Sequence, residues 1–308
     1  MVHGPPTAET RSHVSVVLVA LMALVAGLIS MVLVGGARSA SQGPELIAFT
    51  REDGVYVVGV DRTGLHPLWQ GKRTPTEVTW SPDGRRLAFG ISARSGTRGG
   101  GIWVLNADGS NPVRVAGVPA GSLTWSPDGR RIAFTSKRYG DNPDIWVMNA
   151  DGSNIRLLKR TPRLWERNVD WKPTGGWVAF SSAGYVSFVY VMRTSGRNLR
   201  NLTSERGWLY STDPDWSPDG RRIVFASDRS GSMQIWVMNA SGKQRVRLTR
   251  NRVPSGSPVW SPEGRRIAFV RTDARNEDST IYVMNDDGTG VVKLTEGASP
   301  AWQPVAAP

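Results

Sequence analysis

Few residues of this chain are of the types that carry out nucleophilic or metal-assisted chemistry. Cysteine is absent, which excludes disulfides, thiolate metal sites, cysteine nucleophiles and a lipidated cysteine anchor. Of the three histidines, only His66 lies beyond residue 13. One histidine in the body of the chain argues against a Ser-His-Asp triad and a multi-histidine metal site, and there is no Gly-x-Ser-x-Gly motif. We therefore expect no cofactor, no metal and no catalytic site of these kinds.

The other residues that could act on or bind a ligand are carboxylates, aromatic residues and arginines. A pair of carboxylates cleaves glycosidic bonds without any sequence motif, so an envelope carbohydrate-active enzyme (hydrolase or lyase) with acids in the centre of the fold is an alternative. Tryptophan, tyrosine and arginine anchor protein interfaces and suit stacking on sugars. The competing interpretation is that each tryptophan packs on its own sheet. The candidate binding residues lie between the repeated segments described next and are Trp165, Trp208, Tyr210, Arg163, Arg167, Arg206, Arg250 and Arg252.

A repeated phrase indicates which elements position these candidates. WSPDGRRIAF, residues 125–134, recurs with small changes at 80, 216 and 260, and equivalent tryptophans follow one another at intervals of 42–46 residues. Each period holds four short segments of strand composition, separated by Ser-Pro-Asp-Gly turns and by Asp-Gly or Ser-Gly turns. Four antiparallel strands in a repeat of this length predict one blade of a β-propeller.

The two ends of the repeat region complement each other. Residues 46–49 begin in the middle of a repeat, and residues 299–304 end as a lone first strand. Five whole repeats and this composite predict an all-β, six-bladed propeller over residues 44–304, closed by pairing of the C-terminal strand with the N-terminal blade. The strand tryptophans are expected in the core, at Trp80, Trp103, Trp125, Trp146, Trp171, Trp216, Trp236, Trp260 and Trp302.

The phrase W-S-P-D-G-R-R-I-A-F, followed by I-W-V-M-N-A-D-G-S, resembles the WD40-like (PD40) repeat of the TolB family and of the gating propellers of prolyl-oligopeptidase-type enzymes. The resemblance covers residues 44–304 and implies the fold rather than the function, because propellers host many unrelated activities. TolB is the periplasmic component of the Tol system and carries a further N-terminal α/β domain. That domain has no counterpart here, so its peptidoglycan-associated partner is not carried over.

Arginine pairs follow the first turn of four blades, at positions 85/86, 130/131, 221/222 and 265/266. They form a ring on one face, which would be either a polyanion platform or a set of solvated hairpin residues. We favour the second interpretation, because charge runs usually lie in solvent. The fourth blade has WKPTGGW at residues 171–177 instead, so a gap in the ring is expected.

The N-terminal region differs from the rest of the chain. Residues 14–34 carry no charge and are long enough to predict a transmembrane helix. A signal peptide cleaved near residues 35–37 is the alternative, with an apolar region longer than usual. The expected organisation is a tail at 1–13, the helix at 14–34, a linker at 35–43 and the propeller. A hydrophobic segment followed directly by a folded domain favours export, to the periplasm or the cell surface.

The formal net charge of +12 should attract polyanions. No nucleic-acid-binding motif accompanies this charge, and an exported domain rarely meets DNA, so nucleic acid is disfavoured as a partner. We therefore predict a non-catalytic, membrane-tethered binding module for a protein partner or an anionic cell-envelope polymer.

Overall fold

The computed structural model describes Met1 and residues 45–304, except for 92–99, 139–141, 160–164, 205–208 and 274–278. The chain divides into two units, Met1–Gly43 and Pro44–Pro308. The predicted tail, transmembrane helix and linker, at 1–13, 14–34 and 35–43, lie outside the described residues apart from Met1. Within the described ranges, no helix has the length and apolar character needed to span a membrane.

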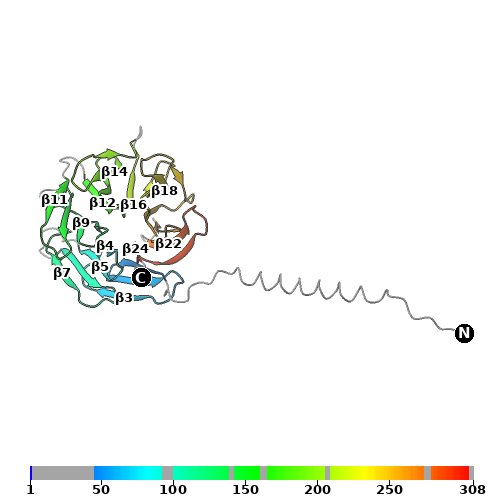
Figure 1. Ribbon diagram of the computed structural model, residues 1–308, viewed down its shortest axis with the longest axis horizontal. Helices are drawn as coiled ribbons and strands as arrows, with labels where there is room; N and C mark the ends of the chain where they lie inside the picture. Colours follow the sequence, from blue (N-terminus) through cyan, green and yellow to red (C-terminus); the bar gives the residue numbers. More distant parts are fainter. Residues whose placement is uncertain are drawn as a thin grey trace. The chain divides into compact units, whose positions relative to one another are not determined.

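The described residues form six four-stranded antiparallel sheets, the blades of a propeller (Figure 1). Blade 1 contains β1 (Leu46–Arg51), β2 (Gly54–Gly59), β3 (His66–Gln70) and β24 (Ala298–Trp302). Blade 2 contains β4 (Pro75–Trp80), β5 (Arg86–Ile91), β6 (Gly101–Asn106) and β7 (Val113–Ala116). Blade 3 contains β8 (Leu123–Trp125), β9 (Arg131–Ser136), β10 (Asp144–Asn149) and β11 (Arg156–Lys159). Blade 4 contains β12 (Trp165–Trp171), β13 (Trp177–Ala183), β14 (Ser187–Arg193) and β15 (Arg200–Asn201). Blade 5 contains β16 (Ser211–Trp216), β17 (Arg222–Ser227), β18 (Gln234–Asn239) and β19 (Val246–Arg247). Blade 6 contains β20 (Ser255–Trp260), β21 (Arg266–Thr272), β22 (Ser279–Asn285) and β23 (Val292–Glu296).

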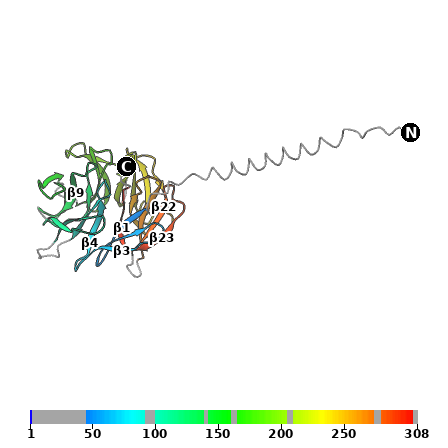
Figure 2. The ribbon, with the colours of Figure 1, turned by 60° about the horizontal axis from the view of Figure 1, so that its bottom comes forward.

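The ring closes as the sequence predicted. β24 pairs antiparallel with β1, so blade 1 combines the last strand with the first three. The blue strands of blade 1 lie beside the orange and red strands of blade 6 in both views (Figures 1 and 2). Arg266 strengthens this junction, because its guanidinium forms an ion pair with Glu45 and stacks on Trp302, 5.1 Å from the ring centroid. Closure covers the inner edge of β1 with β24.

Apolar residues of neighbouring blades pack into shared clusters. In one of them, Ile102 of blade 2 lies with Trp125 and Ile132 of blade 3. The second strand of every blade contributes one fully buried phenylalanine, at positions 49, 89, 134, 180, 225 and 269. Burial on both faces explains why these strands are apolar at almost every position. Seven of the nine strand tryptophans are buried, whereas Trp103 and Trp236 are half-buried against the same clusters.

The two hairpin turns of the repeat have different structural roles. In the first turn, Ser126 Oγ donates to Asp128 and also accepts from the backbone N–H of Arg131 at 2.9 Å, which holds the start of β9. In the second turn, Gly152 has φ +86°, and a side chain there would overlap the backbone carbonyl of Val115 in the preceding blade. The second turn therefore needs glycine both for its backbone conformation and for the approach of one blade to the next.

The arginine pairs divide between two roles. The second arginine of each pair stacks on the tryptophan that ends the inner strand of the next blade, with 4.4–5.1 Å from guanidinium to ring centroid; the contacts are Arg86–Trp125, Arg131–Trp171, Arg222–Trp260 and Arg266–Trp302. The first member of each pair is exposed, and the second is half-buried. Our interpretation of both members as solvated hairpin residues was therefore wrong for the second, which forms part of the packing between blades.

The expected gap in this ring at blade 4 is filled by another residue. Lys172 places its ammonium 5.0 Å from the centroid of Trp216, although it stands in the first turn rather than at the start of a strand. At the boundary between blades 1 and 2, Leu46 occupies the arginine position and packs in the cluster that contains Trp80. A cation covers the tryptophan at five boundaries between described blades, and an apolar side chain packs in the cluster at the sixth.

Candidate functional site: the central channel and its mouth

The innermost strands of the six blades enclose a central cavity of about 1070 Å³. Every blade contributes to its wall, through β4, β8, β12, β16, β20 and β24. Residues that precede β8 and β10, such as Pro119 and Pro143, also line the cavity. These residues belong to the loop face, which we define as the face that carries the connections between blades and the loops between second and third strands. The cavity therefore reaches the loop face, where ligands of rigid scaffolds commonly bind.

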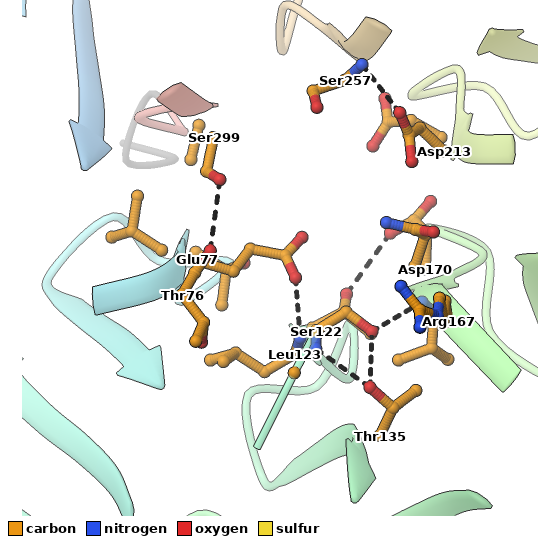
Figure 3. A pocket seen from close by; sticks show the side chains of 18 of the residues that line it. Thr76, Glu77, Ser122, Leu123, Thr135, Arg167, Asp170, Asp213, Ser257 and Ser299 are labelled. Atoms are coloured by element: carbon orange, nitrogen blue, oxygen red, sulfur yellow. Dashed lines mark hydrogen bonds between the residues drawn. The ribbon is translucent and has the colours of Figure 1, made fainter. Parts of the chain in front are cut away.

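Four carboxylates line this channel: Glu77 on β4, Asp170 on β12, and Asp213 and Asp215 on β16. Each of them accepts a hydrogen bond from a backbone N–H of the next blade. Glu77 accepts from Leu123 at 3.2 Å, and Asp213 accepts from Ser257 at 2.9 Å (Figure 3). Similarly, Asp170 accepts from Trp216 at 2.8 Å, and Asp215 from Trp260 at 2.7 Å. The channel acids thus join adjacent blades as well as facing the cavity.

The environment of these acids favours their neutral form. Burial in the channel wall, reinforced by the negative charges of Asp213 and Asp170, raises the pKa of Glu77 to about 8. Burial raises the pKa of Asp170 to about 7, and burial together with the charges of Asp170 and Glu77 holds the pKa of Asp215 well above its usual range. Burial also raises the pKa of Asp213. The channel therefore carries protons near neutral pH and gains negative charge as the pH rises.

Beside the mouth of the channel, Trp165 contacts two cations that line it. Trp165 begins β12 and is 44% exposed. The ammonium of Lys137 lies 5.8 Å from its ring centroid, and the guanidinium of Arg167 lies 5.3 Å from it. Both cations also line the channel (Arg167 is labelled in Figure 3). The structure thus brings together two of the predicted residues, Trp165 and Arg167, and adds Lys137, which lies just after β9.

The remaining candidates are placed differently. Tyr210 is 44% exposed, and its hydroxyl donates to the backbone oxygen of the exposed Tyr185 at 3.1 Å on the loop face. Arg250 and Arg252 are exposed between β19 and β20 and are absent from the channel lining. Arg163, Arg206 and Trp208 lie outside the described residues. Their assignment to the site remains a prediction.

Sequence reasoning did not single out the four channel acids or Lys137. The repeat itself contained the signal for the acids, because Asp170 and Asp215 stand one residue before an inner-strand tryptophan, and Glu77 and Asp213 stand three residues before one. Simple alternation along the strand does not place Glu77 and Asp213, because the register of β4 and β16 shifts at these residues and Asp213 has φ +51°. Among the described residues, no group of three or more acids and histidines converges on a metal-binding position.

A closed ring of six four-stranded blades around a polar channel defines a β-propeller with a preformed central cavity. Residues 168–308 match the family described as PD40, the TolB beta propeller domain. A solved structure of a putative TolB from Agrobacterium tumefaciens is similar over 83% of this chain and 90% of that chain, with 26% identity and a TM-score of 0.66. The resemblance to TolB-type propeller repeats is therefore confirmed.

Two curated relatives extend the comparison. An uncharacterized protein from Agrobacterium fabrum is 30% identical over 204 residues, which cover 63% of this chain and 65% of the relative. The Tol-Pal system protein TolB from Nitratidesulfovibrio vulgaris is 39% identical over 67 residues, which cover 21% of this chain and 15% of that protein. The chain thus spans less than two thirds of the length of either relative.

Proposed function

We propose that this protein is a non-catalytic binding module of the TolB type, which binds a protein partner of the cell envelope at the mouth of its channel. The observation that carries the proposal is the exposed Trp165 between Lys137 and Arg167, beside a preformed cavity. Aromatic and arginine side chains are the common anchors of protein interfaces, and a rigid scaffold lowers the entropic cost of presenting them. The similarity to TolB proteins supports the same class of function.

Capture from an envelope extract on the immobilised full chain tests this function. The partner is identified by mass spectrometry, and its binding is measured at about 50 and about 500 mM salt, because screening removes simple charge attraction. We expect a protein partner that is retained at high salt and lost with Trp165→Ala. Leu157→Ala is the matched control, since Leu157 is also exposed but lies on an outer strand, β11. Capture that is equally strong with both variants would refute the proposed site.

We also propose that residues 14–34 tether the propeller outside the cytoplasm, as their length and lack of charge support. Sequencing the N-terminus of the mature protein separates the two forms of this proposal. An intact N-terminus in the membrane fraction after alkaline extraction fits an anchor, whereas a new N-terminus near residues 35–38 identifies a cleaved signal peptide. A full-length protein in the cytosolic fraction contradicts both.

A carbohydrate-active enzyme is the second candidate function, and the channel acids favour it. A carboxyl whose pKa is about 8, such as that of Glu77, is protonated at neutral pH and suits a general acid. Release of reducing sugar ends from envelope polysaccharide, abolished by Glu77→Gln or Asp213→Asn but not by the exposed Glu52→Gln, would support it. If the unchanged protein releases no reducing ends, the enzyme function is wrong and the binding function alone explains the channel.

A further inference from the structure

The arrangement at Trp165 restricts how this residue can take part in binding. Its ring lies within cation–π distance of both Lys137 and Arg167, at 5.8 and 5.3 Å. A sugar that stacked on a cation-covered face of the ring would have to displace that cation. Trp165 therefore serves as a platform that holds two cations at the mouth, rather than as a free stacking surface.

The two cations have no acidic partner of their own. Among the described residues, no carboxylate forms an ion pair with Lys137 or Arg167, although ion pairs occur elsewhere, as between Arg222 and Asp286 at 3.1 Å. Both side chains are exposed and both line the cavity. Two cations that contact the same ring and have no described counter-charge attract an oxyanion, and a guanidinium presents parallel N–H groups that match a carboxylate.

The interior of the same channel is lined by acids instead of cations. Its other ionisable lining residues are Glu77, Asp170, Asp213 and Asp215, and the lining of β8, β20 and β24 is uncharged. A second negative group reaching inward would raise the pKa values of these acids further and gain no attraction, whereas an ammonium group would lower their pKa values and be attracted to the ionised carboxylates. The order of groups along the channel, cations at the mouth and acids inside, thus favours a ligand with one negative and one positive end over a polyanion.

We propose that the channel mouth binds a zwitterionic ligand, whose carboxylate lies against Lys137 and Arg167 and whose ammonium group points inward toward Asp170 and Asp213. This inference rests on the proposed function and specifies the chemistry that the site recognises. The amide of Asn168, on the same strand and lining the same cavity, offers a further donor, since its oxygen already accepts from Ser181 Oγ at 2.8 Å. The ligand class is a linear chain with an amine at one end and a carboxylate at the other.

Matched small molecules test the proposal directly. The full chain is titrated at low salt with 5-aminovalerate, 6-aminohexanoate and 8-aminooctanoate, and with hexanoate and hexylamine, and binding is followed by ligand-observed NMR. We expect at least one amino acid of the series to bind roughly tenfold more tightly than either single-charge analogue, because two charges are satisfied at once. If no member binds more tightly than both hexanoate and hexylamine, the proposal is wrong.

Variants assign the two ends of the ligand. Arg167→Ala and Lys137→Ala should each lower the affinity for the tightest-binding amino acid of the series to that for hexylamine. The affinity for hexylamine itself should not change. Asp213→Asn should weaken it to the level of hexanoate. Lys243→Ala is the matched control, because Lys243 is an exposed cation on the opposite face, in the turn between β18 and β19, and should have no effect. An equal loss with Lys243→Ala would indicate general charge attraction and overturn the assignment.

The outcome is separable from that of the proposed function. If the amino acids show no preference but capture of the protein partner still depends on Trp165, the binding module stands and the ligand chemistry is wrong. If the preference is found without any partner that depends on Trp165, the propeller binds a small zwitterion and the protein-partner function is wrong.

Discussion

The guanidinium of Arg131 lies 5.0 Å above the ring of Trp171, and this contact joins the third blade to the fourth. The same relationship recurs around the ring, with lysine in place of arginine at Trp216. Both partners belong to the repeated phrase, but they belong to different copies of it. At five of the six boundaries between described blades, one copy of the phrase therefore supplies a cation and the next copy supplies the tryptophan.

The two members of an arginine pair should differ in their effect on stability. Arg131→Ala removes the contact with Trp171, and we expect the free energy of unfolding to fall by about 1 kcal/mol. Arg130→Ala, one residue earlier and exposed, should change it by less than about 0.5 kcal/mol. Urea unfolding followed by tryptophan fluorescence measures both. Equal losses for the two variants would show that the stacking does not stabilise the ring.

Two glycines with similar backbone conformations should respond differently to alanine. Gly175 has φ +77°, and no atom lies within 4 Å of the position that a Cβ would take. Gly175→Ala should therefore lower the free energy of unfolding only by the strain of a left-handed backbone conformation, about 1–2 kcal/mol. Gly152 has φ +86°, and its Cβ would overlap the carbonyl oxygen of Val115 in the preceding blade. We expect Gly152→Ala to cost clearly more, measured as the difference in unfolding midpoint. A cost no larger than that of Gly175→Ala would contradict the close contact between blades.

The channel acids predict a dependence of stability on pH. The pKa of Glu77 is about 8 in the folded protein and 4.5 ordinarily, so the folded state keeps a proton that the unfolded chain loses. The free energy of unfolding therefore falls as the pH rises through this interval. Glu77→Gln keeps an oxygen for the N–H of Leu123 and has no proton to lose. We expect it to gain about 1–3 kcal/mol relative to the unchanged protein between about pH 5 and pH 8.

Denaturant titrations at several pH values, with Glu52→Gln as the control, measure this difference. Glu52 is exposed, so its substitution removes one negative charge without changing the channel. A gain that is the same at all pH values, or that appears with Glu52→Gln as well, would mean that the proton on Glu77 is not the cause.

The closing strand should be sensitive to the loss of its tryptophan. Trp302 is 6% exposed, carries the ring on which Arg266 stacks, and donates from Nε1 to the backbone oxygen of Val259 at 3.3 Å. We expect Trp302→Ala to lower the free energy of unfolding by about 3–5 kcal/mol, as for other buried aromatic residues. Trp165→Ala, at an exposed position, should cost less than about 1 kcal/mol. Similar costs would indicate that β24 does not stabilise the closed ring.

The fold was predictable because the phrase repeats. Six tryptophans at nearly constant spacing and the Ser-Pro-Asp-Gly turns determined the number of blades, and the partial repeats at the two ends predicted the pairing of β24 with β1. The packing role of Arg131 was missed because a charged residue after a turn usually lies in solvent. Arg131 contacts the next copy of the phrase, about 40 residues later in the chain. An interpretation of neighbouring residues alone does not reveal this contact.

The site was predictable only in part. Trp165 and Arg167 lie two residues apart on one strand, so their proximity follows from the alternation of side chains. Lys137 reaches Trp165 because blade 3 packs against blade 4. The acids inside the channel lie together because inner strands of three blades converge there. Residues that are far apart in the sequence meet there because the ring closes, and no single segment contains that information.

The pairing of β1 with β24 also has a consequence during synthesis of the chain. The two strands are neighbours in one sheet, yet residues 46–51 are made long before residues 298–302. At about 5–20 residues per second, β1 exists for about 10–50 s before its partner has been translated. Until then the edge of β1 that β24 covers in the native ring has no partner, and unpaired strand edges are sites of pairing with other chains. The edge of β1 therefore needs protection during synthesis, before β24 closes the ring.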